Sequence, residues 1–316
     1  MSKISVKRAL FCFVLIIIIN FLLPRMMKGN PISYLTGLDE ELTSVQIEYY
    51  EKALHLDESL FKQFLYYLKS IFDGTLGYSF QKNSTVSTLI FERLKVTLLL
   101  VLPSAIIAAI IGLSFGLKAG FEGPKTDKVL TPIMIIINSF PLFLISLLLI
   151  LFFAFDLKLL PYSGLASTKN SNFLDLVRHL ILPISTITIG LLPSRYLLVR
   201  NMTQKIAKSR CILYQRERGL GNNKIRYFYI LPELLTTFLT NVGLSIGSGI
   251  AGSVVVESIF SINGMGRLLT QAVYTLDYPL MYGILFVTSL AMLISIIIVD
   301  ILSFLLDPRQ RRKLHD

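Results

Sequence analysis

Residues that could do catalytic or metal chemistry are few in this sequence, and their spacing matches no reactive site. The three histidines, His55, His179 and His315, are far apart and show no metal-ligand spacing. No G-x-x-x-x-G-K-S/T motif occurs, so the chain carries no phosphate-binding P-loop of its own. No Ser/His/Asp or Cys/His arrangement stands out. The sequence therefore predicts a protein that is not an enzyme and that binds no cofactor or metal of its own.

A second group of polar residues lies inside long apolar runs. A charge at mid-membrane costs about 2.5–3.5 kcal/mol on insertion scales, so it marks a candidate for function. Asp300 lies inside the last of these runs, and Glu257 lies near the outer end of the one before it. Serine and asparagine side chains could line a pathway beside them. The alternative is that these side chains only form ordinary hydrogen bonds between helices. The same group of polar residues also includes Ser253 and Ser295. The candidates for a translocation pathway are Asn138, Ser139, Asn241, Ser245, Ser248, Glu257 and Asp300.

The segment from Arg200 to Pro232 is strongly basic. It carries eight Lys or Arg residues and one acid, Glu217. Such a segment beside a membrane can lie on anionic lipid, and it can also dock a cytoplasmic partner. Gly219 and Gly221 divide it. Because glycine takes a positive φ without steric cost, we expect a helix to end near Gly219.

The elements that carry these residues are long apolar runs. The chain has 316 residues, of which 53% are hydrophobic and only 16% charged, against roughly 25% charged in a soluble domain. A membrane-spanning helix needs about 20 mostly apolar residues. The sequence thus predicts an all-α polytopic membrane protein with six transmembrane helices. The six runs are Ala9–Met27, Leu94–Leu117, Val129–Phe155, Leu176–Val199, Leu234–Phe260 and Leu280–Leu306.

Two glycine patterns fall inside these runs. The run Gly247–Gly252 matches G-x-G-x-x-G, but no soluble strand precedes it. Gly112, Gly116 and Gly120 recur every four residues. We interpret both patterns as sites of close helix packing rather than as nucleotide binding.

The distribution of basic residues predicts the orientation of the runs. With both termini in the cytoplasm, nineteen Lys and Arg, Arg195 among them, lie inside and twelve outside. Six of those twelve lie between the first two runs, and Arg25 and Lys95 lie at the adjoining ends of these runs. Short cytoplasmic loops normally hold the basic excess. The net charge of +11 is therefore a topology signal, and nucleic-acid binding is disfavoured. We expect residues 1–27 to form the cytoplasmic N-terminus and first span, 28–93 an extracytoplasmic insert, 94–306 the core with its loop 200–232, and 307–316 a cytoplasmic tail.

The insert is expected to hold two short amphipathic helices. Thr43 to Gln46 fits a capping box at the start of the first. Asp57 could cap the second. The insert is either a solvated cap or a surface that docks a partner or guides substrate. The apolar face expected for the second helix consists of Leu60, Phe61, Phe64, Leu65, Leu68 and Phe72.

Short motifs along nearly the whole chain resemble one family: the inner-membrane permease subunits of binding-protein-dependent ABC importers, in the dipeptide, oligopeptide and nickel class. The resemblance is to the first of the two permeases, which has an extracytoplasmic insert after its first span. Each motif is weak alone, but their order and spacing are specific. The motifs are Leu54–Leu60, Asp73–Phe80, Arg93–Leu98, Leu160–Gly164, Glu257–Leu268, Asp277–Pro279 and Asp307–Arg311.

The resemblance also covers the basic segment, which is similar to the family's EAA loop. The glycine of that loop corresponds to Gly219, and its terminal Leu-Pro to Leu231 and Pro232. The usual Glu-Ala-Ala positions hold Leu213, Tyr214 and Gln215. The coupling loop that the resemblance implies therefore includes Leu213, Tyr214, Gln215, Glu217, Arg218, Gly219, Leu231 and Pro232.

The resemblance implies a type I importer permease in the cell membrane with several partners. These are a second permease, two ATPase subunits that bind ATP and Mg, and an extracytoplasmic binding protein. The expected cargo is a short peptide, with nickel or a metal chelate as the alternative. An ion-coupled secondary transporter would need inverted repeats and ion-coordinating acids inside the spans, and a membrane scaffold would transport nothing.

Overall fold

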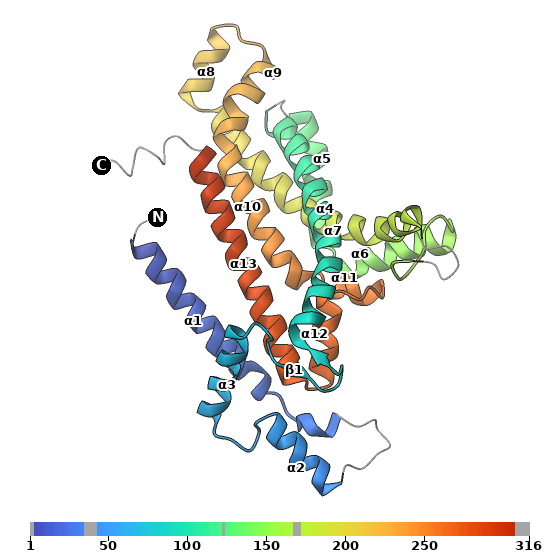
Figure 1. The fold of residues 1–316 in the computed structure, drawn as a ribbon. Helices are drawn as coiled ribbons and strands as arrows, with labels where there is room; N and C mark the ends of the chain where they lie inside the picture. The colour runs from blue at the N-terminus through green and yellow to red at the C-terminus, as the bar shows by residue number, and fades with distance from the viewer. Residues whose placement is uncertain (1–2, 35–42, 122–123, 167–171, 307–316) are drawn as a thin grey trace. The chain divides into compact units, whose positions relative to one another are not determined.

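The structure, a computed structural model, describes residues 3–34, 43–121, 124–166 and 172–306. Within these ranges the structure describes only the backbone of residues 3–10, 12, 251, 300 and 302–306. The chain divides into two compact units. Unit 1 comprises Met1–Val96 and Asn263–Leu290, and unit 2 comprises Thr97–Ile262 and Ala291–Asp316. Helices form nearly all of the described structure (Figure 1).

Unit 1 combines the N-terminal helices with a segment from the C-terminal third of the chain. The two strands of its hairpin pair antiparallel, with Tyr78 opposite Thr85. The helices α4 and α13 begin in unit 1 and continue into unit 2. The elements of unit 1 are α1 (Lys3–Arg25), the 3-10 turn η1 (Pro31–Tyr34), α2 (Ser44–Ala53), α3 (Leu60–Phe72), β1 (Tyr78–Ser79), β2 (Ser84–Thr85), α12 (Met265–Tyr274) and the starts of α4 (Val86–Phe121) and α13 (Tyr278–Leu306).

The insert lies in unit 1, where the expected caps of its two helices can be compared with the structure. The capping box of Thr43 and Gln46 at the start of α2 is confirmed, because each residue's side chain bonds the other's backbone. The expected cap of α3 at Asp57 is wrong. The N-cap residue is Ser59, and nearby the side chain of Gln63 donates to the carbonyl of Glu58 at 2.8 Å. The side-chain amide of Gln63 thus serves the turn that leads into the helix.

The apolar face expected for α3 is also wrong in part. Tyr67 is buried among Phe21 of α1 and Tyr282 of α13, with Phe64 and Ile71 packed against this cluster. Phe61 and Phe72, along with Leu60 and Leu65, are exposed instead. The buried face of α3 is therefore rotated about the helix axis from the predicted one. The pattern of apolar residues did not reveal this, because the buried face includes the phenol of Tyr67 and the polar Gln63.

Unit 2 consists of packed helices. The elements α5 and α6 both pack against α7, and α10 packs against α7 as well. The end of α7 leads into a short helical pair, α8 and α9, which continues into α10 (Figure 1). The elements of unit 2 are the main part of α4, α5 (Pro124–Ser139), α6 (Leu142–Leu149), the π-helix η2 (Ile150–Asp156), α7 (Phe173–Ala207), α8 (Arg210–Glu217), α9 (Asn222–Ile225), the π-helix η3 (Arg226–Ile230), α10 (Leu231–Gly252), α11 (Val254–Ile259) and the end of α13.

Four helical segments of the described residues are long and apolar enough to cross a membrane: Val86–Phe121, Phe173–Ala207, Asn222–Ile250 and Tyr278–Val299. A fifth is the bent pair Lys125–Ser139 and Leu142–Asp156, if the pair counts as one span. The first apolar run is helical as Lys3–Arg25, but its apolar part within the described side chains is the shorter Phe13–Arg25. The count of six spans therefore stays a prediction.

The third run is not the single straight helix that we expected. It bends by 100° between Ser139 and Leu142. Pro141 has no backbone N–H and disfavours the helical conformation at Phe140, so the chain leaves the helix there. Pro141 itself is extended, with φ −62° and ψ 144°, and begins the next helix as its N-cap. The fifth run is also divided, because α10 ends at Gly252 and α11 is a separate short helix.

The glycines of α4 allow it to approach α7 closely. A Cβ built on Gly116 would lie 2.7 Å from the Cβ of Val199, and one on Gly120 would lie 2.6 Å from the Cβ of Thr203. The glycine run of α10 allows that helix to approach α13 closely, since a Cβ on Gly247 would lie 2.9 Å from the backbone of α13. The interpretation as packing sites is confirmed for the glycines of α4 and for Gly247 and Gly249, whereas a Cβ on Gly252 would meet nothing within 4 Å.

Candidate functional site

A cavity of about 280 Å³ lies in unit 2. Its walls come from the end of α5, the start of α6, the middle of α7 and the second half of α10. This size falls near the lower end of the range for small-molecule sites. Its lining residues are Ile137, Asn138, Phe140, Leu142, Ile187, Gly190, Leu191, Ser245, Ser248, Gly249, Gly252 and Ser253.

The structure brings three of the predicted pathway residues to this cavity: Asn138, Ser245 and Ser248. The two serines are one helical turn apart on α10, and the break at Pro141 leaves Asn138 near the open end of α5. Ser253 of the same polar set also lines the cavity. Amide and hydroxyl groups on otherwise apolar walls can replace the water around a polar solute without binding it tightly.

The other predicted pathway residues lie elsewhere. Ser139 is exposed, and its hydroxyl donates to the carbonyl of Ile135 at 2.9 Å within its own helix. Asn241 is half-buried one turn before Ser245 and does not line the cavity. The side chain of Asp300 lies outside the described residues.

Glu257 is fully buried one residue layer behind the cavity. Its carboxylate accepts hydrogen bonds from the hydroxyl of Thr97 at 2.6 Å and from that of Ser253 at 2.8 Å. Because Ser253 lines the cavity, Glu257 reaches it through a single hydroxyl group. The sequence placed this acid near the outer end of the fifth run, and the structure shows it inside the core of unit 2.

Arg195 is a residue of this site that the sequence analysis did not select. It is fully buried in α7, where it donates to the carbonyl of Leu191 at 2.9 Å and to the hydroxyl of Ser245. Its Nε has no hydrogen-bond partner among the described residues, and it forms no ion pair with an acid there. Its position within the run Leu176–Val199 was the available signal, but the count that predicts the orientation of the runs groups it with the cytoplasmic Lys and Arg. The cavity therefore has a fixed positive charge directly behind one of its serines.

The second candidate region is the segment formed by α8, α9 and η3. Its inner side is apolar, and Ile212, Ile225 and Ile230 are buried against α4 and α7. The guanidinium groups of Arg216 and Arg226 lie 4.9 Å and 5.7 Å from the ring centre of Phe121 in α4. The segment is thus fixed to the ends of α4 and α7 rather than free on the surface.

Gly219 ends α8 as the sequence predicted, with φ +75°. The N–H of Gly219 bonds the carbonyl of Arg216 at 2.9 Å, and the N–H of Leu220 bonds the carbonyl of Gln215 at 3.2 Å. This pair of bonds is the Schellman arrangement, which satisfies the last carbonyls of a helix. The expectation of a helix end at Gly219 is confirmed.

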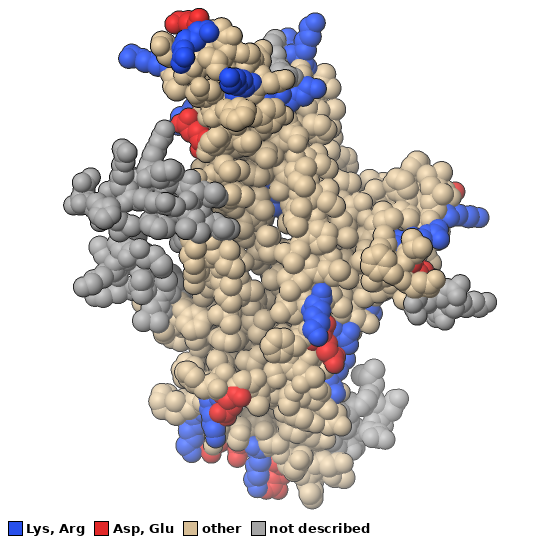
Figure 2. Space-filling model, turned by 45° about the horizontal axis from the view of Figure 1, so that its top comes forward, with Lys and Arg blue, Asp and Glu red and all other residues tan. Residues whose placement is uncertain are grey.

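The outer side of the segment carries most of the residues assigned to the coupling loop. Leu213 and Tyr214 are exposed, as are Glu217, Arg218 and Gly219. Figure 2 shows Lys and Arg side chains projecting from the end of unit 2 that α8 and α9 form. A partner could contact this surface directly.

The remaining three residues of the predicted coupling loop differ from one another in exposure. Gln215 is buried and cannot contact a partner, and Leu231 is half-buried. Pro232 is exposed in the first turn of α10. Tyr227 and Phe228 were not selected from the sequence, but they lie within the same segment 200–232 and are exposed. Consecutive aromatic residues in a basic segment were the available signal in the sequence.

Comparison with known proteins places these features in a family. The family model described as binding-protein-dependent transport system inner membrane component matches residues 108–312. A second model, the N-terminal part of the membrane component of such systems, matches residues 1–101. Together with the apolar helices, these matches confirm an all-α, multi-pass membrane protein.

Relatives of known name support the same placement. The chain is 30% identical over 299 residues to the nickel import system permease protein NikB of Staphylococcus aureus strain USA300, covering 94% of this chain and 87% of the relative. The same values hold for NikB of strain NCTC 8325. For NikB of strain MRSA252 the identity is 30% over 297 residues, covering 93% of this chain and 86% of the relative.

Proposed function

The chain belongs to the family of binding-protein-dependent transport system inner membrane components, in the dipeptide, oligopeptide and nickel class, and from this premise we propose that it forms the membrane pathway for short peptides together with a second permease. Members of the family are membrane components of ABC importers in which separate subunits hydrolyse ATP. Two ATPase subunits, which bind ATP and Mg, and an extracytoplasmic binding protein complete the proposed complex.

The observation that carries the choice of cargo is Arg195 beside the cavity of unit 2. A buried guanidinium is costly in a membrane and persists where it faces polar groups or serves function. Its charge is bound to Ser245, which lines the cavity, and it has no acidic ion-pair partner among the described residues. The cavity has opposite charges behind two of its serines, Arg195 behind Ser245 and Glu257 behind Ser253. Arg195 repels a free divalent cation and attracts a carboxylate, and Glu257 attracts the ammonium group at the other end of a peptide. Short peptides carry a carboxylate and several amide groups, which the cavity's hydroxyl and amide side chains can solvate.

Nickel is the second candidate, and the relatives named NikB favour it. Among the described residues no group of three or more His, Cys, Asp or Glu could hold a metal ion. Free nickel would therefore pass the cavity without side-chain ligands and next to Arg195. A nickel ion wrapped in a carboxylate chelator avoids this repulsion, so we expect any nickel cargo to be a chelate.

Coupling to ATP hydrolysis is assigned to the surface of α8 and α9. Its exposed Leu213, Tyr214 and Arg218 offer apolar, aromatic and cationic contacts to an ATPase subunit. The buried isoleucines behind them pack on α4 and α7, so a push on this surface is transmitted to those helices. A basic helix resting on anionic lipid is the alternative, and it would require no partner.

The proposed topology follows the basic residues. Residues 28–93 face outward, 200–232 face the cytoplasm, and both termini are cytoplasmic in the cell membrane. The proposed division places 1–27 in the first span, 94–306 in the core and 307–316 in the tail. The exposed cations over α8 and α9 support the cytoplasmic side for that segment, because cytoplasmic loops carry the Lys and Arg excess.

Uptake by vesicles that hold the whole complex tests the cargo. A labelled tripeptide, free nickel and nickel with a carboxylate chelator are offered in parallel. We expect saturable peptide uptake. Arg195→Met should lower it by about tenfold, equivalent to about 1.4 kcal/mol of transition-state or binding free energy. Arg178→Met is the matched control, since Arg178 is an exposed arginine of the same helix.

The outcomes separate the candidates. Saturable uptake of free nickel without peptide uptake would overturn the proposal. Uptake of the nickel chelate alone would favour the second candidate and retain the role of Arg195. Because Arg195→Met removes a buried charge, Arg195→Lys serves as a second variant that preserves charge and loses the fork of hydrogen bonds.

A further inference from the structure

The helix α3 of unit 1 carries a row of large apolar side chains that the rest of the described chain leaves uncovered. Phe61, Leu65 and Phe72 are 70%, 47% and 86% exposed. They are separated by four and seven residues, a spacing that places them on one side of a helix. We call this row the outer stripe of α3. A contiguous apolar row of this size on a protein surface marks a site of interaction with another protein or with a membrane.

A second row of side chains, apolar along their length and polar at the tip, borders the outer stripe. Lys62, Tyr66 and Lys69 repeat the helical spacing next to the stripe, and all three are exposed. The stem of a lysine covers apolar surface while its ammonium group stays in water, and a tyrosine has the same two-sided character. Lysine is depleted from the cores of protein–protein interfaces. An apolar face bordered by lysines and aromatic residues is instead typical of a helix that lies at a membrane surface.

The opposite face of α3 packs against α1. The side-chain oxygen of Gln63 accepts a hydrogen bond from Nε of Arg25, the last residue of α1, at 3.2 Å. One turn later in α3, the ring of Tyr67 stacks on that of Phe21, with ring centres 5.9 Å apart. Phe21 lies one turn earlier in α1 than Arg25. Contacts that advance along α3 therefore move back along α1, so α3 runs antiparallel beside the last turns of α1.

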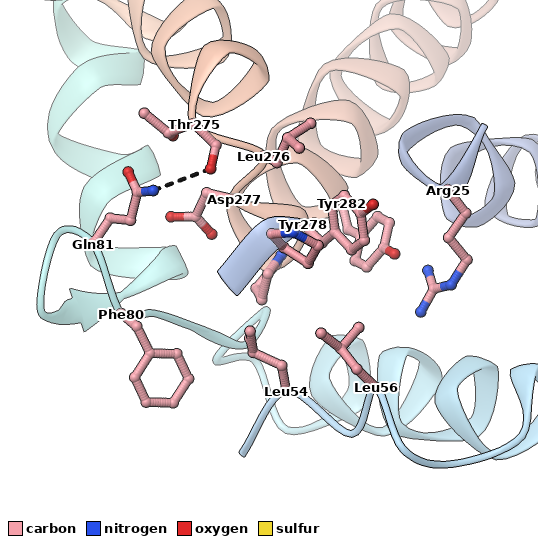
Figure 3. Close-up of a pocket in the computed structure, with 12 residues that line it drawn as sticks. Arg25, Leu54, Leu56, Phe80, Gln81, Thr275, Leu276, Asp277, Tyr278 and Tyr282 are labelled. Carbon is pink, nitrogen blue, oxygen red and sulfur yellow. Dashed lines mark hydrogen bonds between the residues drawn. The ribbon is translucent and has the colours of Figure 1, made fainter. Parts of the chain in front are cut away.

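The end of α1 and the start of α13 lie at the same level. The guanidinium carbon of Arg25 is 5.9 Å from the ring centre of Tyr278, the first residue of α13, and 5.2 Å from that of Tyr282. Figure 3 shows these three residues at a recess of about 40 Å³. The segment Tyr278–Val299 is long and apolar enough to cross a membrane. Because arginine and tyrosine side chains collect where a membrane meets water, this junction marks the boundary of the bilayer.

The helix α3 starts at this boundary and continues on its membrane side. Gln63 contacts Arg25 at the boundary, and Phe72 follows nine residues later in the same helix, about 13 Å along its axis. Since α3 is antiparallel to α1, this direction leads back along the apolar part of α1. The outer stripe is thus held at the level where lipid headgroups give way to acyl chains.

We propose that α3 is an interfacial helix whose outer stripe, Phe61, Leu65 and Phe72, binds the lipid leaflet at the end of α1. The stripe buries its rings among the upper parts of the acyl chains, and Lys62 and Lys69 extend their ammonium groups to the headgroups. Through this face the insert contacts lipid rather than water or a protein. The proposal requires only that the chain is a multi-pass membrane protein, and it depends neither on the cargo nor on the surface of α8 and α9.

Tryptophan fluorescence tests the position of the stripe. The chain contains no tryptophan, so Phe61→Trp, Leu65→Trp and Phe72→Trp each introduce a single probe at an exposed position. Each full-length variant is reconstituted in phosphatidylcholine vesicles, with or without lipids brominated close to the headgroup. We expect blue-shifted emission, several-fold quenching by the brominated lipid and weak quenching by aqueous iodide. Tyr49→Trp is the matched control, because Tyr49 is an exposed aromatic residue of α2, and it should show the reverse pattern.

A second set of variants tests whether the rings hold the helix at the lipid. In the Leu65→Trp protein, Phe61→Ser and Phe72→Ser together should increase quenching by iodide several-fold, because the helix loses its apolar anchors. Tyr49→Ser in the same background should leave the quenching unchanged. Both serine substitutions are at exposed positions, so the packing of α3 on α1 is preserved.

The assembled complex distinguishes lipid from a protein partner. A benzophenone amino acid placed at position 72 in cells should form no adduct with the second permease or with the binding protein. An adduct with either would overturn the proposal and assign the stripe to a protein interface. Quenching of the Phe72→Trp probe by iodide but not by brominated lipid would also overturn it and would show a solvated cap. Neither measurement involves transport, so failure here is distinguishable from failure of the proposed function.

Discussion

Replacing Gly219 is a direct test of the proposed coupling surface, because the effect of a side chain there arises from the backbone conformation and not from a clash with neighbours. Gly219 is exposed, and a Cβ built on it would meet nothing within 4 Å. Its φ is +75°, and the turn is closed by the two backbone bonds that end α8. A larger residue therefore causes no clash, and the cost of Gly219→Val arises from the backbone conformation alone.

The magnitude follows from that conformation. A left-handed residue with a Cβ costs roughly 1–2 kcal/mol, and a β-branched residue is a poor occupant of this region. This free energy lowers the population of the closed turn by a factor of about 5–30. Gly219→Asn should cost less, since Asn adopts this conformation more readily. Insertion into the membrane should be unaffected, because the turn lies outside the apolar spans.

Gly221 supplies a matched control two residues away. It is exposed, a Cβ on it also meets nothing within 4 Å, and its φ is −65°. Gly221→Val adds the same side chain to the same surface without backbone strain. We expect co-purification of the ATPase subunits and substrate-stimulated ATP hydrolysis in vesicles to fall in the order wild type, Gly221→Val, Gly219→Asn, Gly219→Val. If the two valine variants behave alike, or if Gly219→Val retains full association and coupled uptake, the surface of α8 and α9 is better explained as a helix that rests on lipid.

Three further predictions concern topology, packing and the buried acid. In single-cysteine proteins, a membrane-impermeant thiol reagent applied to intact cells should label Ser59→Cys and spare the native, exposed Cys211; the reverse pattern would exclude the proposed orientation. Gly116→Ala should lower the free energy of unfolding by about 1–3 kcal/mol, measured as thermal stability of the purified complex. Its new Cβ would lie 2.7 Å from a side chain of α7, and Gly252→Ala, with open space around it, should be silent in the same melt. Glu257→Leu removes the carboxylate that accepts from the buried hydroxyl of Thr97, while Ser253 keeps the carbonyl of Ile250 as an acceptor. It should destabilise the complex by about 1–3 kcal/mol and by more than Glu257→Gln does. Equal melting temperatures of the two variants would show that these hydrogen bonds are unimportant.

Most helices were predictable from the sequence because length and apolarity decide them. The runs Leu94–Leu117 and Leu176–Val199 lie inside α4 and α7, which extend past them at both ends. The extensions mix apolar residues with polar and charged ones, so a criterion of continuous apolarity cannot find them. The division of the third run was missed for the opposite reason. Apolar composition continues through Pro141, and the backbone geometry of one residue decides the bend.

The site was predictable only where a local rule applies. Gly219 was found because the end of a helix depends on backbone conformation, which glycine signals in the sequence. Asn138 and Ser245 were found as polar residues in apolar runs, but their meeting at one cavity depends on how α5 and α10 each pack against α7. Arg195 was missed because its burial depends on where α7 is covered by neighbours, which one helix alone does not reveal.

The two candidate regions of unit 2 are joined by one helix. In α7, Arg195 contacts the cavity through Ser245, and Val199 and Ile206, one and three turns further on, belong to the apolar core beneath α8 and α9. The glycines of α4 hold that helix against the same stretch of α7 at van der Waals distance. Close-packed interfaces of this kind do not deform gradually; they shift between discrete arrangements. A displacement of α8 and α9 is therefore expected to move α7 as a rigid element and to carry Arg195 with it. The charge beside the cavity and the surface proposed to bind the ATPase should then change position together, which is the physical requirement for coupling transport to hydrolysis.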